Sequence, residues 1–316
     1  MFVNGSHPTQ SMLRITGLQA FALMLGLSLV APLAPPASAQ GTPGPDGRTI
    51  VPRDTSDPAR HRTLFTYRDA ALAGGFAVLT VAMFPLDRRT AEKLQDPDLR
   101  DNKFFDRSGK GLEAISTPGS FIIGGGLYAA GKLTNHPDLS DLGWHGTEAV
   151  LIASGLTSLL KGVLGRSRPY VHSDTTPRDF GFLRGFGRNK PKLRDDGTPT
   201  QSGDFQSFPS GHTTTAFAAA AAVTSEMRRM HPGSLIIVAP VMYGGATLVG
   251  LSRMYHNNHW ASDVALGAAI GTFSGLKVVR YSHAHPDNKL DKFILGATAF
   301  PNLDGGGTLA FSYSVP

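Results

Sequence analysis

Apolar residues along this chain gather into six long segments separated by polar stretches. Ala, Leu and Gly dominate these segments, and they lack the strict alternation of apolar and polar residues that marks strands. This pattern predicts an all-α protein built on a six-helix bundle core. The expected helices cover 67–86, 115–133, 145–164, 209–230, 234–252 and 260–280.

The start of the chain departs from this pattern. An apolar stretch from Ile15 to Ala31 follows the single charge of Arg14, and Ala37-Ser38-Ala39 fits a small-x-small cleavage site. We therefore expect a signal peptide at 1–39, with an uncleaved membrane anchor as the alternative. Residues 40–66, rich in Pro, Gly, Asp and Arg, have the composition of a linker.

The end of the chain also changes character. The expected helical domain, 67–280, is followed by a tail at 281–316. In the tail, an apolar segment at 293–300 precedes a glycine-rich turn, and apolar residues then alternate with small polar ones over 309–315. This arrangement is typical of a β-hairpin, and no candidate chemistry falls in it.

Composition narrows the function classes. The chain has no cysteine, which excludes disulfides and thiolate metal sites. Its formal net charge of +6 favours anionic substrates or lipid headgroups, while the absence of a basic, aromatic-interleaved stripe argues against nucleic-acid binding. The sequence offers no convincing cluster of metal ligands. Lone histidines such as His136, His145 and His231 are interpreted as surface or loop residues.

Candidate chemistry lies in three short polar motifs in the second half of the chain. The first places Lys161 near the end of the third expected helix and Arg168-Pro169 seven residues on. Seven residues are about two helical turns, so both cations can converge on one anion. A guanidinium adds a planar fork that suits phosphate oxygens. Taken alone, the pair is more often a basic cap on a helix C-terminus.

The second motif is Pro209-Ser210-Gly211-His212, which opens the fourth expected helix. Free N–H groups and the helix dipole at such a start favour a bound anion, and Gly211 permits close approach of the backbone. His212 then faces the same anion as a proton donor. A capped helix with an ordinary histidine is the alternative. A long connection at 165–208 joins the first two motifs and is expected to cover part of the site.

The third motif runs from Ser252-Arg253 to His259 and Asp263. His259 and Asp263 are four residues apart on one helical face, so the carboxylate can hold one imidazole N–H and leave the other nitrogen as a nucleophile. A serine triad using Ser252 or Ser262 lacks the usual Gly-x-Ser-x-Gly elbow. Alone, the pair is more often a surface helix contact.

Taken in order, the three motifs resemble a known family. Lys161-x6-Arg168-Pro169, Pro209-Ser210-Gly211-His212 and Ser252-Arg253-x5-His259-x3-Asp263 look like the three-part signature of the type 2 phosphatidic acid phosphatase and vanadium haloperoxidase superfamily. Every signature position is filled. The resemblance covers about 67–280, and the six expected helices are similar to the six-helix core of that family.

The resemblance implies a metal-independent phosphatase, a phosphoric ester hydrolase without a cofactor. It implies that His259 attacks phosphorus to form a phosphohistidine, that Asp263 orients His259, and that His212 protonates the leaving oxygen and then activates water. The residues implied to hold the phosphate oxygens are Lys161, Arg168, Ser210, Gly211 and Arg253. The neighbours interpreted as packing residues beside the motifs are Arg166, Tyr255, His256 and Trp260.

The motifs leave the substrate open between a lipid phosphate, an isoprenoid pyrophosphate and small soluble esters. A vanadate-dependent haloperoxidase and a catalytically idle binding protein of the same fold are the alternatives. Several uncharged runs are shorter than the roughly 20 residues that a membrane span requires, and the mean hydropathy is −0.08. We therefore expect an exported protein of the periplasm or cell envelope, soluble or at the membrane surface, with an integral membrane protein as the alternative.

Overall fold

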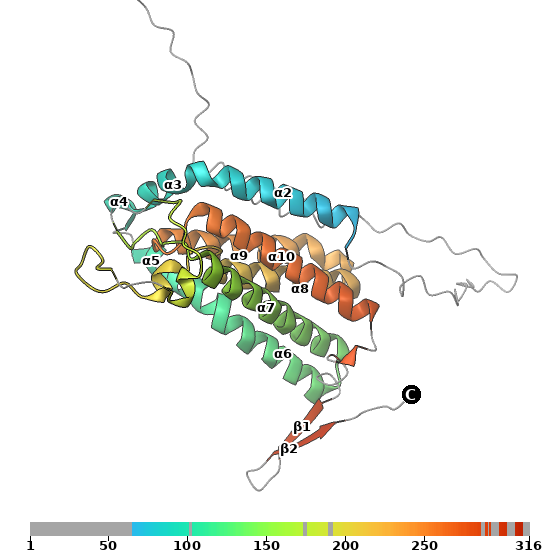
Figure 1. The fold of residues 1–316 in the computed structure, drawn as a ribbon. Coiled ribbons are helices and arrows are strands. Elements are labelled where there is room, and N and C mark those ends of the chain that lie inside the picture. Colours follow the sequence, from blue (N-terminus) through green and yellow to red (C-terminus); the bar gives the residue numbers. More distant parts are fainter. Residues whose placement is uncertain are drawn as a thin grey trace, which may run out of the picture.

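The computed structural model describes residues 65–100, 103–172, 176–188, 192–285, 288–289, 291, 297–301 and 307–311. Long helices lie side by side in this part of the chain, which confirms the predicted all-α bundle (Figure 1). The expected signal peptide at 1–39 and nearly all of the expected linker lie outside the described residues.

Six long helices form the bundle in the described ranges. They are α2 (Tyr67–Met83), α6 (Ser120–Thr134), α7 (Pro137–Leu164), α8 (Gly211–Met230), α9 (Leu235–Tyr255) and α10 (Ala261–Ala284). Shorter helices connect α2 to α6: α3 (Asp87–Leu94), α4 (Pro97–Arg100) and α5 (Lys103–Ala114), the last joined to α6 by a π-helical stretch at Ile115–Gly119.

The six predicted segments correspond to the six long helices, but α7 begins earlier than expected. Its first residue is Pro137, and Asp138 lies in its first turn. Proline at the first helical position needs no N–H partner, and an acidic residue there complements the helix dipole, so this polar stretch starts a helix without an apolar pattern.

The close approach of α8 and α10 organises the core. Three glycines on α10, spaced four residues apart at Gly267, Gly271 and Gly275, face α8. A β-carbon at any of them would lie under 3.0 Å from an α8 backbone oxygen or from the oxygen of its capping residue Ser210. Small residues on one helix face allow two backbones to pack tightly, as they do in membrane helix bundles.

Several outer helices present apolar side chains to the surroundings. Exposed residues of this kind include Val78 and Val81 on α2, Ile122 and Ile123 on α6, Leu151, Ile152, Leu156 and Leu159 on α7, and Ile236, Ile237, Val241 and Leu248 on α9. An apolar surface of this extent is unusual on a protein that faces only water.

Within the described part of the chain, four helical stretches are long and apolar enough to cross a membrane. They are Tyr67–Leu94, Pro137–Leu164, Pro232–Tyr255 and Ala261–Ala284. Each is longer than the uncharged run inside it, because charged residues near the helix ends, and Glu148 inside Pro137–Leu164, interrupt the runs. The run lengths in the sequence therefore understated the spans. Together with the exposed apolar side chains, these helices support membrane association.

The C-terminal tail contains the predicted β-structure. Strands β1 (Ala297–Pro301) and β2 (Gly307–Phe311) pair antiparallel, with Ala299 opposite Leu309. Residues 302–306, where the turn was expected, lie outside the described part of the chain.

Candidate active site

The three motifs meet at one end of the bundle because consecutive long helices run in opposite directions (Figure 1). Lys161 lies in the last turn of α7, His212 in the first turn of α8, and Arg253 in the last turn of α9. The connection after α7 packs back on this end, where the backbone N–H groups of Gly181 and Leu183 donate to the last carbonyls of α7.

Direct contacts join the motifs to one another. The backbone N–H of Ser210, which caps α8, donates to the carbonyl oxygen of Asp263 at 2.9 Å. A β-carbon at Gly211 would lie 3.6 Å from Cε of Lys161, at ordinary van der Waals distance. The start of α8 therefore faces both the lysine of the first motif and the aspartate of the third.

His259 and Asp263 form a buried pair. Nδ1 of His259 lies 3.4 Å from Oδ2 of Asp263, which also accepts hydrogen bonds from the Trp260 N–H at 2.8 Å and from the Ser207 hydroxyl. An ionised Asp263 keeps the ring proton on Nδ1 and leaves Nε2 with a free lone pair. Burial, with the nearby Lys161 ammonium, holds the pKa of His259 well below its usual range, so the ring is neutral as a nucleophile requires.

Arg166 holds this pair in place, although the sequence indicated only a packing residue. The side chain is completely buried, and its guanidinium pairs with Oδ1 of Asp263 and with Oδ2 of Asp87, the latter at 2.6 Å. It also donates to the Ser262 hydroxyl at 2.7 Å. The guanidinium carbon lies 5.0–5.6 Å from the ring centroids of four aromatic residues, Phe84, Phe180, Phe208 and Trp260.

Asp87 was missed by the sequence interpretation. It begins α3 and accepts hydrogen bonds from the Ser262 N–H at 2.8 Å and the Ser262 hydroxyl at 2.7 Å. Asp87 therefore fixes both the guanidinium of Arg166 and the first turn of α10. Its distance from Ser262 along the chain left no local signal for this contact.

Lys161 and Arg168 are held by neutral groups. The Lys161 ammonium donates to the carbonyl oxygen of Gln206, and Arg168 donates to the Gly203 carbonyl at 2.9 Å and the Asn258 side-chain oxygen at 3.1 Å. Within the described ranges, neither cation has a carboxylate partner. Their charges are thus free to attract an anion.

Arg253 has a carboxylate partner that the sequence did not indicate. Its guanidinium pairs with Oε1 of Glu113 on α5, and the same oxygen lies 2.5 Å from Nδ1 of His256. Burial alone raises the pKa of Glu113, but His256 and Arg253 outweigh it and hold the pKa below its usual value. Nε of Arg253 is buried without a hydrogen-bond partner in the described structure.

His212 faces the same group of charges. Burial, followed by the positive charge of Arg253, lowers its pKa to about 4. Lys161 and Arg168 act in the same direction, while Glu113 opposes them. His212 is therefore neutral near pH 7 in this arrangement and gains a proton more readily once an anion offsets the cations.

The other motif neighbours pack as interpreted. The Tyr255 hydroxyl donates to the Leu99 carbonyl at 3.0 Å, and the Trp260 indole N–H donates to the Ser167 carbonyl at 2.9 Å. Both bonds tie the motif segments to the surrounding connections.

His145 corrects the interpretation of the lone histidines. It lies inside α7, is buried, and pairs with Glu226 of α8. With His283 of α10 these residues form a cluster of metal-ligand type, although the sequence offered none that was convincing. The reason is that the three residues are separated along the chain and meet only when the helices pack.

Comparisons with known proteins agree with the motifs. Residues 143–287 match the family model described as PAP2 superfamily. The chain is 44% identical over 69 residues to a lipid A 1-phosphatase of Porphyromonas gingivalis. This alignment covers 22% of this chain and 15% of that protein. It is 33% identical over 156 residues to a probable diacylglycerol pyrophosphate phosphatase 1 of Schizosaccharomyces pombe, covering 46% and 55%. The chain thus spans less than two thirds of either relative.

Among solved structures, the chain is similar to the crystal structure of a transmembrane PAP2 type phosphatidylglycerolphosphate phosphatase from Bacillus subtilis. The TM-score is 0.44 at 19% sequence identity. The alignment covers 71% of this chain and 99% of the other.

Proposed function

We propose that this chain, whose residues 143–287 match the PAP2 superfamily as its motifs predicted, is a membrane phosphatase that hydrolyses a lipid phosphate through a phosphohistidine. The proposal rests mainly on one observation: three cations, a helix N-terminus and the His259–Asp263 pair lie together at one end of the bundle. The outer helices of this bundle are apolar.

In the first step, Nε2 of His259 attacks phosphorus and the ester oxygen leaves with a proton from His212. The product alcohol departs, and a phosphoryl group stays bonded to His259. In the second step, His212 takes a proton from water, the resulting hydroxide attacks phosphorus, and inorganic phosphate leaves. Asp263 stabilises the positive charge that His259 carries between the two steps.

Fixed positive groups stabilise the transition state. Lys161, Arg168 and Arg253 surround the place where charge grows on the equatorial phosphoryl oxygens, and the hydroxyl of Ser210 and the N–H of Gly211 add donors at the start of α8. Such preorganised donors are the dominant catalytic contribution in phosphoryl transfer.

A lipid substrate fits the position of the site relative to the helices. Helix α7 has 28 residues, so it is about 42 Å long and exceeds a hydrocarbon core of roughly 30 Å. Lys161, in its last turn, then lies at the depth of the phosphate headgroups. The names of the two curated relatives, both lipid phosphatases, support the same substrate class.

The test is phosphate release by the purified full chain in detergent from a lipid phosphate, a lipid pyrophosphate and a soluble aryl phosphate. His259→Ala should lower release by at least about 10³-fold, the scale of losing a catalytic nucleophile. The matched control is His231→Ala, an exposed histidine beyond the other end of α8. Quenching in alkaline denaturant should trap phosphate on the wild type and none on His259→Ala, because the N–P bond of a phosphohistidine is stable in alkali and is lost in acid.

Two results separate the parts of the proposal. Wild-type turnover by His259→Ala would eliminate the phosphohistidine mechanism. Equal kcat/KM values for the aryl phosphate and the lipids would reject the lipid substrate and leave the mechanism standing.

We further propose that the site end of the bundle faces the outside of the cytoplasm. Because the chain contains no cysteine, single cysteines can report the orientation. Arg188→Cys lies exposed in the connection over the site, and His136→Cys lies exposed at the start of α7, at the opposite end. A membrane-impermeant maleimide should label Arg188→Cys in intact cells and spare His136→Cys. Labelling of His136→Cys instead would place the site in the cytoplasm and reject export.

A further inference from the structure

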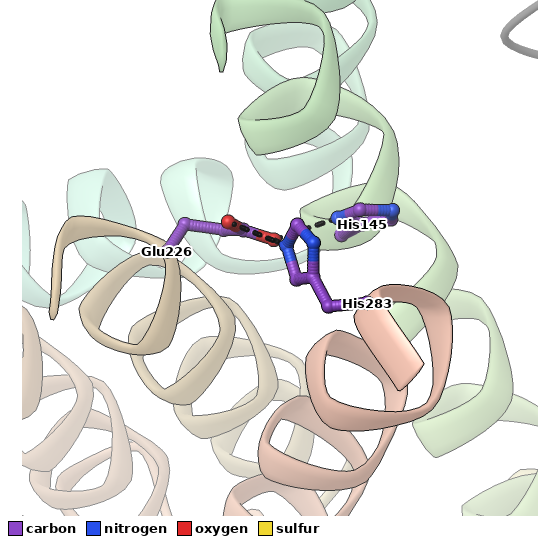
Figure 2. Close-up of side chains that lie close together, drawn as sticks. All are labelled: His145, Glu226 and His283. Atoms are coloured by element: carbon purple, nitrogen blue, oxygen red, sulfur yellow. Dashed lines mark hydrogen bonds and ion pairs between the residues drawn. The ribbon is translucent and has the colours of Figure 1, made fainter. Parts of the chain in front are cut away.

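Far from the candidate active site, three helices bring together two histidines and a glutamate (Figure 2). His145 comes from α7, Glu226 from α8 and His283 from α10. Glu226 lies fourteen residues beyond His212 on α8, which is about 21 Å along the helix axis. The cluster therefore belongs to the opposite end of the bundle.

The three side chains point at one another. Oε1 of Glu226 lies 2.6 Å from Nδ1 of His145 and 2.8 Å from Nε2 of His283. One potential ligand atom from each residue lies within 4.8 Å of the others. His145 and Glu226 are almost completely buried, so packing fixes their positions before any ligand binds.

A second carboxylate stands behind His145. Oδ2 of Asp291 lies 3.8 Å from Nε2 of His145, and the Trp144 indole N–H holds Oδ1 of Asp291 at 2.8 Å. Both ring nitrogens of His145 thus face carboxylates. A doubly protonated ring donates to both carboxylates, whereas a neutral ring leaves one nitrogen lone pair facing an anion. A metal cation on the Nδ1 side can replace the Nδ1 proton, while the remaining proton points from Nε2 to Asp291.

The surroundings carry an excess of negative charge. Asp141 and Glu148 lie one turn before and after His145 on α7, and both interact electrostatically with it. Oε2 of Glu148 is buried with no hydrogen-bond partner in the described structure. Arg229 is a basic residue near the cluster, but its side chain is about half exposed and its Nε lies 4.0 Å from Oε2 of Glu226.

We propose that His145, Glu226 and His283 bind a divalent transition-metal ion, with Zn²⁺ as the best fit. Two imidazole nitrogens and a carboxylate are a recognised zinc ligand set, and a water completes the tetrahedron. The ion takes the place of the ring protons that face Glu226. With bonds of about 2.0–2.1 Å, tetrahedral ligand atoms lie roughly 3.3 Å apart, so the side chains must separate slightly from their hydrogen-bonded positions.

The expected role is structural, because the ion would cross-link α7, α8 and α10. These helices also carry Lys161, His212 and Asp263 at their other ends. Binding energy gained at this end contributes to the stability of the whole bundle. The inference is independent of the proposed phosphatase chemistry.

The test uses the full chain in detergent, stripped with a chelator and then titrated with Zn²⁺ by calorimetry, with melting followed by circular dichroism. The wild type should bind one ion per chain and melt at a higher temperature with it. His283→Ala should weaken binding by at least about tenfold and abolish the shift in melting temperature, while the control His231→Ala should match the wild type. Co²⁺ should give the intense visible bands of a tetrahedral site in the wild type alone.

His283→Ala is the decisive variant because the His283 ring is partly exposed in the last turn of α10. The variant is therefore expected to keep a folded bundle, which its helical circular dichroism spectrum checks. Glu226→Gln adds a second test that keeps side-chain volume. Equal Zn²⁺ affinity in the wild type and His283→Ala, or no Zn²⁺ binding by the wild type, would overturn the proposal and leave the cluster as a hydrogen-bonded triad.

Discussion

Replacement of Arg166 by leucine is the most direct probe of how the candidate site is held together. The change removes the ion pairs to Asp87 and Asp263 and the hydrogen bond to Ser262, while leucine keeps part of the apolar contact with the surrounding aromatic rings. Both carboxylates are completely buried. Removing one partner from a buried pair typically costs about 3–5 kcal/mol, because the remaining charge is neither paired nor hydrated.

The assay is thermal unfolding in detergent, followed by helical circular dichroism, together with phosphate release below the melting temperature. Arg166→Leu should melt well below the wild type and lose kcat, since Asp263 loses the bond that fixes Oδ1. Adding Asp87→Asn should recover part of the lost stability, because it removes one of the two unpaired charges. Arg166→Lys should have a melting temperature and a kcat between those of the wild type and Arg166→Leu, since an ammonium lacks the planar fork that reaches both carboxylates at once.

Two results would refute this reasoning. One is an unchanged melting temperature and unchanged kcat in Arg166→Leu. The other is strict additivity of Arg166→Leu and Asp87→Asn, which would mean that these two side chains do not interact energetically.

Two further predictions address the packing and the electrostatics. Gly271→Ala should destabilise the bundle by about 1–3 kcal/mol, because its β-carbon would press on the α8 backbone. The control Gly245→Ala should leave the stability unchanged, because the space around Gly245 is open. Thermal unfolding of both variants tests this difference. Because the pKa of His212 falls from 6.5 to about 4 on folding, the unfolded chain binds more protons between these values. The free energy of unfolding should therefore decline by up to about 3 kcal/mol as the pH drops from 6.5 to 4 and then level off. His212→Asn should flatten this part of a profile of unfolding free energy against pH. An equally steep profile in the variant would contradict the assignment of this pH dependence to His212.

The features that sequence reasoning reached are local ones. Lys161 and Arg168 are close along the chain, Ser210 to His212 are contiguous, and His259 and Asp263 are one helical turn apart. Local spacing therefore marked each group as a candidate, and the order of the three motifs gave the family resemblance. The helices followed from apolar periodicity, whose signal is strongest over long segments. Their order and opposite directions then bring the motifs to one end of the bundle.

The features it missed depend on contacts between distant segments. Asp87 meets Arg166 and Ser262 only after α3 packs beside α10, and Glu113 reaches Arg253 only through the packing of α5 on α9. His145 has no motif around it, and its burial depends on the rotation of α7 in the bundle. Membrane association was understated for a different reason, since a span is set by the length of a helix and not by its longest uncharged run.

The charges at the candidate site explain why it should favour a phosphate dianion and why His212 can act as an acid. Arg166 is balanced by Asp87 and Asp263, and Arg253 by Glu113, whereas Lys161 and Arg168 contact neutral oxygens. The remaining positive charge, with burial, holds the pKa of His212 at about 4. A bound dianion cancels this charge and raises the pKa toward neutrality. The proton needed by the leaving oxygen is thus acquired when the substrate arrives, which couples binding to acid catalysis. Activity should fall at high pH as His212 loses its proton, and this alkaline limb should have a higher apparent pKa in kcat than in kcat/KM, because kcat reports the bound complex.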